Sequence, residues 1–358
     1  MATLVTGATG FLGRHLIDAL LARGDRVRAL VRSQTDAADL ATLPIEIARG
    51  DVMQPDTIEA AMCGVARVYH TAAMVDIGSS IDHGMSRLNT EGTRNVLAAA
   101  WRAGVERVVY TSSVGAIGAG DVRTRLDEDD TYSGRGTSLP YQRSKLLADR
   151  AAMNFLDRGL PLVPVYPTLF MGPGDRYLRT THSILSFLVG RAPAYIAGGF
   201  GLSDVRDVAR GHLLAMDRGE IGRRYILGGT NISLFQFYKT LESITGLRAP
   251  TLRIPAFLGH VAATVTKWAE PIRGKPAVIT HGDVDSARLY WFYDYSRARD
   301  ELGLTCRPVA ETLRDAVAWL RTEVLGKWRV RLDAGERPAR RGWFRRDRIT
   351  RTHPIVRN

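Results

Sequence analysis

Residues 1–170 alternate short apolar runs, rich in β-branched residues, with longer amphipathic stretches. The runs predict strands and the stretches predict helices, because side chains repeat every two residues along a strand and every 3.6 along a helix. The predicted strands are 2–6, 26–31, 45–48, 67–70, 107–111 and 162–166. The predicted helices are 11–23, 56–62, 86–103 and 141–158. This alternation indicates an α/β fold of the Rossmann type, a doubly wound parallel sheet covered by helices on both faces.

Beyond Gly172 the pattern changes to longer helical segments joined by proline-containing connections. We therefore expect three parts of the chain. Residues 1–170 form the nucleotide-binding Rossmann domain, and residues 171–326 form a smaller, mostly helical substrate domain, from which some segments can return to the first sheet. Residues 327–358 form a basic extension.

Composition narrows the class of protein. Hydrophobic residues make up 45% of the 358 and charged residues 24%, which is typical of a folded globular chain. The sequence has no apolar run of membrane-spanning length, no signal peptide is recognised at its start, and its only cysteines are Cys63 and Cys306. We expect a cytoplasmic protein with reduced thiols.

The net charge of +12 is concentrated at the end of the chain. The segment 327–358 contains eleven basic and three acidic residues, so it carries +8 and the rest of the chain carries +4. Nucleic acid is therefore not an expected partner of the body. The extension, which includes Trp328, Trp343 and Phe344, suits contact with an anionic membrane surface, contact with nucleic-acid phosphate or a solvated segment.

A glycine-rich turn, Gly7-Ala8-Thr9-Gly10-Phe11-Leu12-Gly13, joins the first predicted strand to the first predicted helix. Glycines at this position allow a tight turn and let a pyrophosphate approach the helix N-terminus, where free N–H groups favour negative charge. We expect a dinucleotide there, bound through Gly7, Gly10, Phe11, Leu12 and Gly13.

The end of the second strand bears on the choice of dinucleotide. An acidic residue there bonds the ribose hydroxyls of NAD, whereas an arginine can pair with the 2′-phosphate of NADP. The sequence has Arg32 at this point and no acid before Asp36. NADP(H) is therefore favoured over NAD(H), although Arg32 is also compatible with an ordinary solvated position.

Tyr141 and Lys145 lie four residues apart, on one face of a predicted helix. A nearby ammonium group favours a phenolate, so we expect Lys145 to lower the pKa of Tyr141 and prepare it for proton transfer. Ser113 lies at the end of the fifth strand, where its hydroxyl can reach the same carbonyl oxygen. We predict Ser113, Tyr141 and Lys145 as the catalytic set.

With these motifs in order, the chain resembles the extended short-chain dehydrogenase/reductases, in the NAD-dependent epimerase/dehydratase family. The likeness covers about residues 2–320 and is carried by segments 6–13, 50–52, 70–73, 89–95, 110–113 and 141–145. Residues 165–170 (Val-Tyr-Pro-Thr-Leu-Phe) resemble the Pro-Thr segment of dihydroflavonol-4-reductase-like members. Segments 191–195 and 224–229 resemble bacterial hopanoid-associated proteins labelled epimerases.

The resemblance implies further cofactor contacts, with Lys145 also bonding the nicotinamide ribose. Asp51 and Val52 would flank the adenine. The remaining contacts, to the nicotinamide side, would be Thr71, Ala72, Ala73, Pro167, Thr168 and Phe170. It also implies a homodimer through the helices around 86–103 and 141–158.

The function that fits best is an NADP-dependent oxidoreductase that reduces a ketone or oxidises a secondary alcohol on a small, apolar substrate. A nucleotide-sugar epimerase with tightly bound NAD is the alternative, although the Asn usual after the sixth strand of such enzymes is absent at 166–168. A nucleotide-sensing scaffold without catalysis is a third hypothesis. No metal is expected, because the eight histidines lack ligand spacing and the acidic run 127–130 is predicted to be a solvated loop.

Overall fold

A seven-stranded parallel sheet lies at the centre of the protein, in the order β10-β6-β5-β4-β1-β2-β3. The computed structural model describes residues 1–33, 38, 40–77, 82, 84–122, 124–130, 135–136, 139–268 and 279–326. The strands are β1 (Ala2–Thr6), β2 (Val27–Val31), β3 (Glu46–Arg49), β4 (Val65–His70), β5 (Arg107–Thr111), β6 (Leu162–Pro167) and β10 (Tyr225–Leu227). All six predicted strands are present, and their ends differ from the prediction by no more than two residues.

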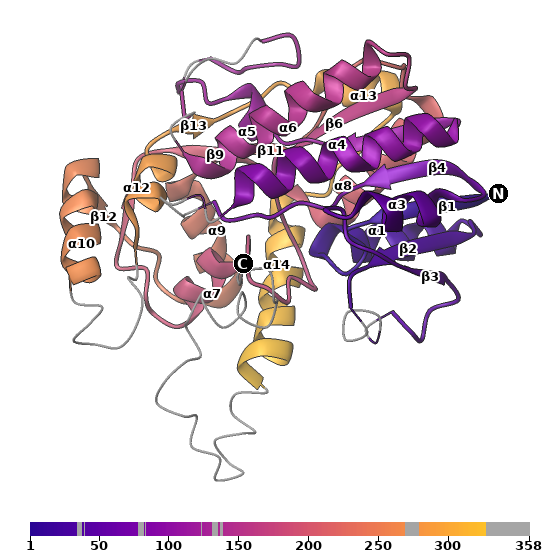
Figure 1. Ribbon diagram of the computed structural model, residues 1–358. Coiled ribbons are helices and arrows are strands. Elements are labelled where there is room, and N and C mark those ends of the chain that lie inside the picture. The colour runs from indigo at the N-terminus through magenta and orange to yellow at the C-terminus, as the bar shows by residue number, and fades with distance from the viewer. Residues whose placement is uncertain are drawn as a thin grey trace.

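Helices cover both faces of this sheet, as the sequence pattern predicts (Figure 1). One face carries α1 (Phe11–Ala22) and α8 (Val205–Arg218), which pack against each other. The other face carries α3 (Pro55–Met62), α4 (Met85–Ala103) and α6 (Pro140–Leu156). A sheet buried on both faces requires strands that are apolar throughout, and every residue of β6 is buried.

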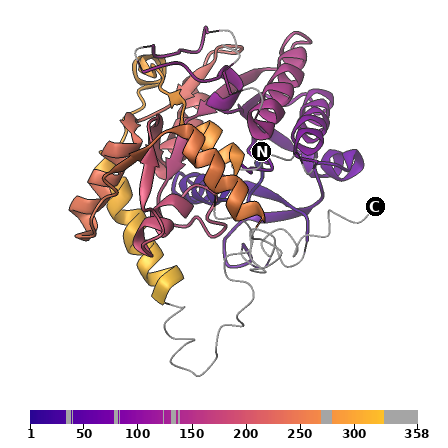
Figure 2. The ribbon, with the colours of Figure 1, turned by 90° about the vertical axis from the view of Figure 1, so that its left-hand side faces the viewer.

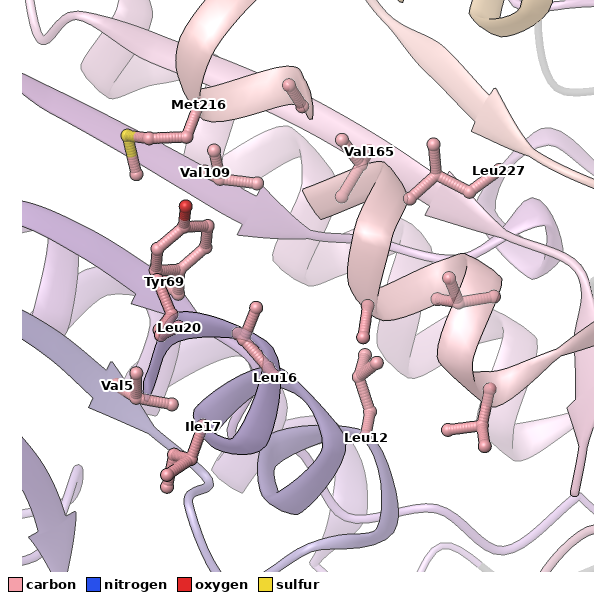
Figure 3. Close-up of a cluster of buried hydrophobic side chains, with 14 of the residues drawn as sticks. Val5, Leu12, Leu16, Ile17, Leu20, Tyr69, Val109, Val165, Met216 and Leu227 are labelled. Carbon is pink, nitrogen blue, oxygen red and sulfur yellow. The ribbon is translucent and has the colours of Figure 1, made fainter. Parts of the chain in front are cut away.

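The packing between α1 and the sheet is drawn in Figure 3. Leu12, Leu16 and Leu20 recur at helical spacing on α1, and all three are buried against the strands. Met216 of α8 approaches the same cluster from above Tyr69 of β4. This core fixes the start of α1 relative to the end of β1, where the glycine turn lies.

The chain beyond residue 171 contributes to two layers. After β7 (Leu169–Met171), α7 (His182–Leu188), β8 (Ala194–Ile196) and β9 (Gly199–Asp204), it returns through α8 and β10 to the seven-stranded sheet. Helix α13 (Ser296–Leu302) also packs on α8 and β10. Segments of the predicted substrate region therefore complete the Rossmann sheet.

A second layer covers the carboxyl edge of the sheet. Its strands β11 (Thr230–Ser233), β9 and β13 (Tyr290–Trp291) form one sheet, with β7 paired to β9, and β12 (Leu252–Ile254) pairs with β8. Around them lie α9 (Leu234–Thr245), α10 (Ala256–Trp268), α12 (His281–Ala287), α14 (Val309–Trp319) and η1 (Leu320–Gly326). The sequence pattern does not predict these strands. Four of them, β7, β8, β12 and β13, have only two or three residues, which is too few for a recognisable alternation.

The strand order reverses at β1, whose neighbours are β2 and β4. In open α/β sheets, ligands bind at the carboxyl ends of the strands on either side of such a reversal. The segments after β1, β4, β5 and β6 all reach this edge. Among the described residues, no helix is both long enough and apolar enough to cross a membrane, and the basic extension 327–358 lies outside the described residues.

Candidate active site

The glycine turn lies directly after β1, where backbone segments approach each other closely. Gly7 has a φ of +73°, and a Cβ atom there would lie 2.7 Å from the backbone nitrogen of Ala72. A Cβ atom on Gly13 would lie 2.1 Å from the carbonyl oxygen of Gly7. Both positions therefore exclude a side chain, and the N-terminus of α1 is held against the end of β1.

A cleft lies in front of this turn, lined by Gly10, Phe11 and the loop after β7. Gly10 caps α1 without any side-chain hydrogen bond, so no side chain of the cap competes for the first N–H groups of the helix. Arg14 and Arg176 line the same cleft from α1 and from the loop after β7. Backbone N–H groups, a helix N-terminus and two guanidinium groups suit a pyrophosphate. The sequence analysis missed Arg176, because only the fold brings it to the turn.

The ends of β2 and β3 form the neighbouring part of the edge. Arg32 follows β2 directly, and its side chain is exposed. Val31 and Arg49 are paired between the two strands, so Arg32 and Asp51 leave the sheet at the same edge. The Asp51 carboxylate accepts a hydrogen bond of 2.9 Å from the N–H of Met53, which holds the turn after β3.

Val52 is buried between the turn after β3 and helix α4. A Cβ atom on Gly92 of α4 would lie 2.9 Å from a methyl group of Val52, and Asn95 donates a hydrogen bond of 3.0 Å to the carbonyl oxygen of Val52. The structure thus places Arg32, Asp51 and Val52 together at one end of the carboxyl edge.

The loop after β4 is held from two directions. Thr71 donates a hydrogen bond of 2.7 Å to the carbonyl oxygen of Thr6, at the end of β1. The side chain of Asn89, on α4, accepts from the N–H of Met74 at 2.8 Å and donates to its carbonyl oxygen at 3.0 Å. Asn89 also donates to the hydroxyl of Ser144 on α6, at 2.9 Å. It therefore joins the loop that contains Thr71, Ala72 and Ala73 to the helix of Tyr141.

Tyr141 lies in the first turn of α6, which begins at Pro140. Ser113 follows β5, where its hydroxyl accepts a hydrogen bond of 3.1 Å from the N–H of Gly115 and also interacts with the Tyr141 phenol. Burial raises the pKa of Tyr141, and the interaction with Ser113 opposes this rise. The structure thus brings Ser113 and Tyr141 together at the carboxyl edge.

Lys145 lies one turn further along α6 and is buried, with an exposed fraction of 4%. Its ammonium group donates a hydrogen bond of 2.9 Å to the carbonyl oxygen of Thr111, at the end of β5. Burial lowers the pKa of Lys145 to about 8, and the carboxylate of Asp149 opposes this change. The expectation that Lys145 lowers the pKa of Tyr141 is wrong for this structure, because desolvation dominates and the pKa of Tyr141 is raised.

The two serines after β5 have different partners. Ser112 is buried and donates a hydrogen bond of 2.7 Å to the carboxylate of Asp149 on α6. Ser113 instead interacts with Tyr141. Asp149, which the sequence analysis missed, is buried one helical turn after Lys145. The spacing of four residues was the available signal, because it places an acid and a lysine side by side on a helix.

The segment after β6 lies beside the glycine turn. The ring centroid of Phe170 is 5.7 Å from that of Phe11, at the start of α1. The Thr168 hydroxyl is buried and shares a hydrogen bond of 2.9 Å with the hydroxyl of Ser203 in β9. Pro167 is paired with Leu227 across β6 and β10. The side chain of Thr168 is therefore engaged with the second layer.

The acidic run 127–130 differs in part from the prediction. Asp127 and Asp129 are exposed, but Glu128 is buried and accepts a hydrogen bond of 2.8 Å from the N–H of Ile226 in β10. Arg297 lies 3.7 Å from the same carboxylate. The prediction of a solvated loop is therefore wrong for Glu128, which has a packing role at the edge strand. In the described part of the chain, no three His, Cys, Asp or Glu side chains gather in a metal-binding arrangement.

These features define a Rossmann-type protein in which a glycine-rich turn, a tyrosine and a lysine lie at the carboxyl edge of one parallel sheet. The chain belongs to the NAD dependent epimerase/dehydratase family, whose model matches residues 3–228. It is an NAD(P)-dependent oxidoreductase of the extended short-chain dehydrogenase/reductase type.

Proteins similar to this chain include reductase-like and sterol-related relatives. A protein of Synechocystis named "Putative dihydroflavonol 4-reductase" is 40% identical over 88% of this chain and 93% of its own length. Sterol demethylase protein B of Methylococcus capsulatus is 39% identical over 90% of this chain and 98% of its own length. The crystal structure of gox2253 matches with a TM-score of 0.79 and 35% identity, covering 90% of this chain and 98% of that one.

Proposed function

We propose that the protein is an NADP-dependent oxidoreductase that interconverts a ketone and a secondary alcohol. The observation that carries this proposal is the position of Tyr141 and Ser113 beside each other at the carboxyl edge, the edge of the sheet that also holds the glycine turn after β1. The name of the relative from Synechocystis, a reductase, supports the same class of reaction.

The residues of the cleft fit a dinucleotide. Gly10 lines the cleft at the N-terminus of α1, where phosphates can approach the backbone, and Arg14 and Arg176 provide positive charge for them. Asp51 and Val52 would hold the adenine, Arg32 the 2′-phosphate, and the segments 71–73 and 167–170 the nicotinamide side. When bound, NADP(H) supplies or accepts the hydride.

The chain's own residues handle the proton. In the reductive direction the Tyr141 phenol donates its proton to the carbonyl oxygen of the substrate, and the Ser113 hydroxyl donates a hydrogen bond to the same oxygen. Lys145, buried one turn further along α6 and hydrogen-bonded to the Thr111 carbonyl oxygen, would bond the nicotinamide ribose of the cofactor. In the oxidative direction, Tyr141 takes the proton back.

Removing the phenolic hydroxyl tests this role. We expect Tyr141→Phe to lower kcat at least about a hundredfold, the low end of a general acid's contribution, while the Kd for NADPH stays within about twofold. Activity is measured with a panel of cyclic ketones and secondary alcohols, and Kd by fluorescence titration. Tyr290→Phe, on β13, serves as the matched control. Wild-type turnover by Tyr141→Phe would exclude the proposed role of the phenol.

The choice between NADP and NAD rests on Arg32. We expect Arg32→Ala to weaken NADPH binding about tenfold or more and to leave NADH binding nearly unchanged, because a single arginine–phosphate contact is worth about 1.5–3 kcal/mol. Arg26→Ala, an exposed arginine at the opposite end of β2, is the control. Equal loss for both nucleotides would contradict this assignment.

The nucleotide that the protein retains through purification distinguishes the reductase hypothesis from the epimerase hypothesis. An epimerase regenerates its cofactor in each cycle, whereas a reductase exchanges it. We expect the denatured protein to release little NAD, and the emptied protein to bind NADPH more tightly than NADH. Stoichiometric release of NAD would instead favour a redox-neutral epimerase.

A further inference from the structure

Helix α10 and the strand before it carry an unusually apolar exposed surface. Six large hydrophobic side chains form it, with exposed fractions from 43% to 79%: Leu252, Phe257, Leu258, Val261, Val265 and Trp268. They make up half of the twelve exposed large hydrophobic residues in the described part of the chain. We call these six residues the α10 surface. Such clustering marks an interaction site, because single exposed apolar residues are normally scattered.

The α10 surface has the spacing of one helical face. Phe257, Val261, Val265 and Trp268 follow each other at intervals of four, four and three residues. The opposite side of the helix is buried through Gly259 and Ala263. A Cβ atom on Gly259 would lie 3.0 Å from Ile196 and 3.1 Å from Val284, so α10 packs closely on β8 and α12.

The position of the helix leaves this face open to solvent. Figure 1 places α10 at the left-hand edge of the molecule, on the side opposite β2 and β3, and Figure 2 shows that side from the front. The helix is therefore fixed by its inner side and presents its apolar side outwards, without any rearrangement of the fold.

The charged side chains of the segment that carries the α10 surface are all positive. Residues 247–268 contain Arg248, Arg253 and Lys267, all exposed, and no aspartate or glutamate. Two copies of this surface that met face to face would bring cations against cations, which disfavours a symmetric dimer through it. A negatively charged, apolar partner complements both properties.

We propose that the α10 surface docks the enzyme onto an anionic lipid bilayer. The helix lies in the plane of the interface, with Phe257 and Trp268 at the boundary between headgroups and acyl chains, and the flanking cations contact the headgroups. The extension 327–358, with a net charge of +8, belongs to the same chain and adds to the attraction. This proposal is independent of the reaction that the enzyme catalyses.

Sedimentation with vesicles tests the docking surface in the full-length protein. We expect wild type to bind vesicles of two parts phosphatidylcholine to one part phosphatidylglycerol, and to bind pure phosphatidylcholine at least tenfold more weakly. Val261→Ser/Val265→Ser should reduce binding to the anionic vesicles about tenfold or more, because two apolar side chains no longer enter the interface. The matched control is Val122→Ser/Ile221→Ser, which changes two exposed apolar residues elsewhere.

Two further variants identify which part of the chain touches lipid. Arg248→Glu/Arg253→Glu should weaken binding to anionic vesicles while the extension is intact. Brominated lipids should quench tryptophan fluorescence in wild type, and the quenching should be reduced in Trp268→Phe. Unfolding transitions equal to those of wild type show that each variant is folded.

Two results would overturn the proposal. The first is wild-type vesicle binding by both double variants, which would assign the contact to the extension alone. The second is a wild-type dimer, seen by sedimentation velocity without lipid, that Val261→Ser/Val265→Ser converts to monomer. That outcome would make the α10 surface an interface between copies of the chain.

Discussion

Lys145 of the candidate active site and Asp149, one turn further along α6, form a buried pair of ionisable side chains. The pKa of Lys145 is lowered to about 8 by burial and raised in turn by Asp149, while burial raises the pKa of Asp149. Ser112 donates a hydrogen bond to the Asp149 carboxylate and keeps it oriented. We therefore expect the charge of Asp149 to help Lys145 remain protonated.

Replacing Asp149 by asparagine should change the pH dependence of turnover. The amide keeps an oxygen that accepts the Ser112 hydrogen bond but loses the negative charge, so the pKa of Lys145 falls further below about 8. Lys145 then loses its proton at lower pH, and the alkaline limb of the kcat profile moves to lower pH. The profile is measured from pH 6 to 10, with Asp157→Asn, at the exposed end of α6, as the control. An unchanged alkaline limb would refute this role.

At the scale of the element, the turn between β1 and α1 combines a tight backbone with a helix N-terminus. Gly10 and Gly13 lie three residues apart but differ in the room around them. A Cβ atom would lie 3.1 Å from the Gly7 carbonyl oxygen at Gly10 and 2.1 Å from it at Gly13. Only the second distance requires the backbone to move.

We expect Gly13→Ala to lower the melting temperature and to weaken NADPH binding at least about tenfold. Within a helix, alanine is normally favoured over glycine by about 1 kcal/mol. A loss of stability in this variant would therefore come from the steric clash that displaces the turn. Gly10→Ala should have a much smaller effect on the melting temperature. Differential scanning calorimetry and nucleotide titration measure the two effects. Equal effects of the two substitutions on the melting temperature would contradict the steric explanation.

At the scale of the whole molecule, buried histidines couple stability to pH. His70 is buried between the hydroxyls of Thr6 and Thr93, and burial lowers its pKa to about 3. His212 on α8 donates to the carbonyl oxygen of Val208 and accepts from Thr111, and burial lowers its pKa to about 4. Both pKa values lie below the ordinary value of 6.5.

The lowered pKa values of the two histidines determine how the free energy of unfolding changes with pH. Between about pH 6.5 and 4, the unfolded chain binds protons at these histidines and the folded protein does not, so the free energy of unfolding falls as the pH falls. Each histidine contributes a slope of up to about 1.4 kcal/mol per pH unit. His212→Asn keeps a hydrogen-bond donor for the carbonyl oxygen of Val208 but removes the titratable imidazole. The slope of the free energy of unfolding between about pH 6.5 and 4 should therefore become shallower by up to about 1.4 kcal/mol per pH unit. Urea unfolding from pH 7 to 4 measures it, with the exposed His182→Asn as the control. A slope equal to that of wild type would contradict the prediction.

The homodimer through the helices 86–103 and 141–158 stays a prediction at this scale. These segments are α4 and α6, which pack against each other on one face of the sheet. Sedimentation velocity of the wild-type protein measures the oligomeric state.

Six of the seven strands of the main sheet, the helices α1, α3, α4 and α6 and the glycine turn could be predicted from the order of the amino acids, whereas β10 and α8 were not predicted. These elements are predictable because hydrophobic periodicity, the conformation of glycine and the signals that start a helix each depend on only a few neighbouring residues. The same local reasoning placed Tyr141 and Lys145 one turn apart on a helix, as α6 has them.

Only the tertiary structure shows how deeply the site side chains are buried. It also shows which residues from distant parts of the chain contact them. Burial depends on all the layers packed around a side chain, so it was the fold that raised the pKa of Tyr141 and buried Glu128 within an acidic run. Arg176 reaches the cleft through a loop that is far from Gly10 along the chain, and Asn89 connects a loop to α6. Such contacts depend on chain topology, which the local pattern of residues does not contain.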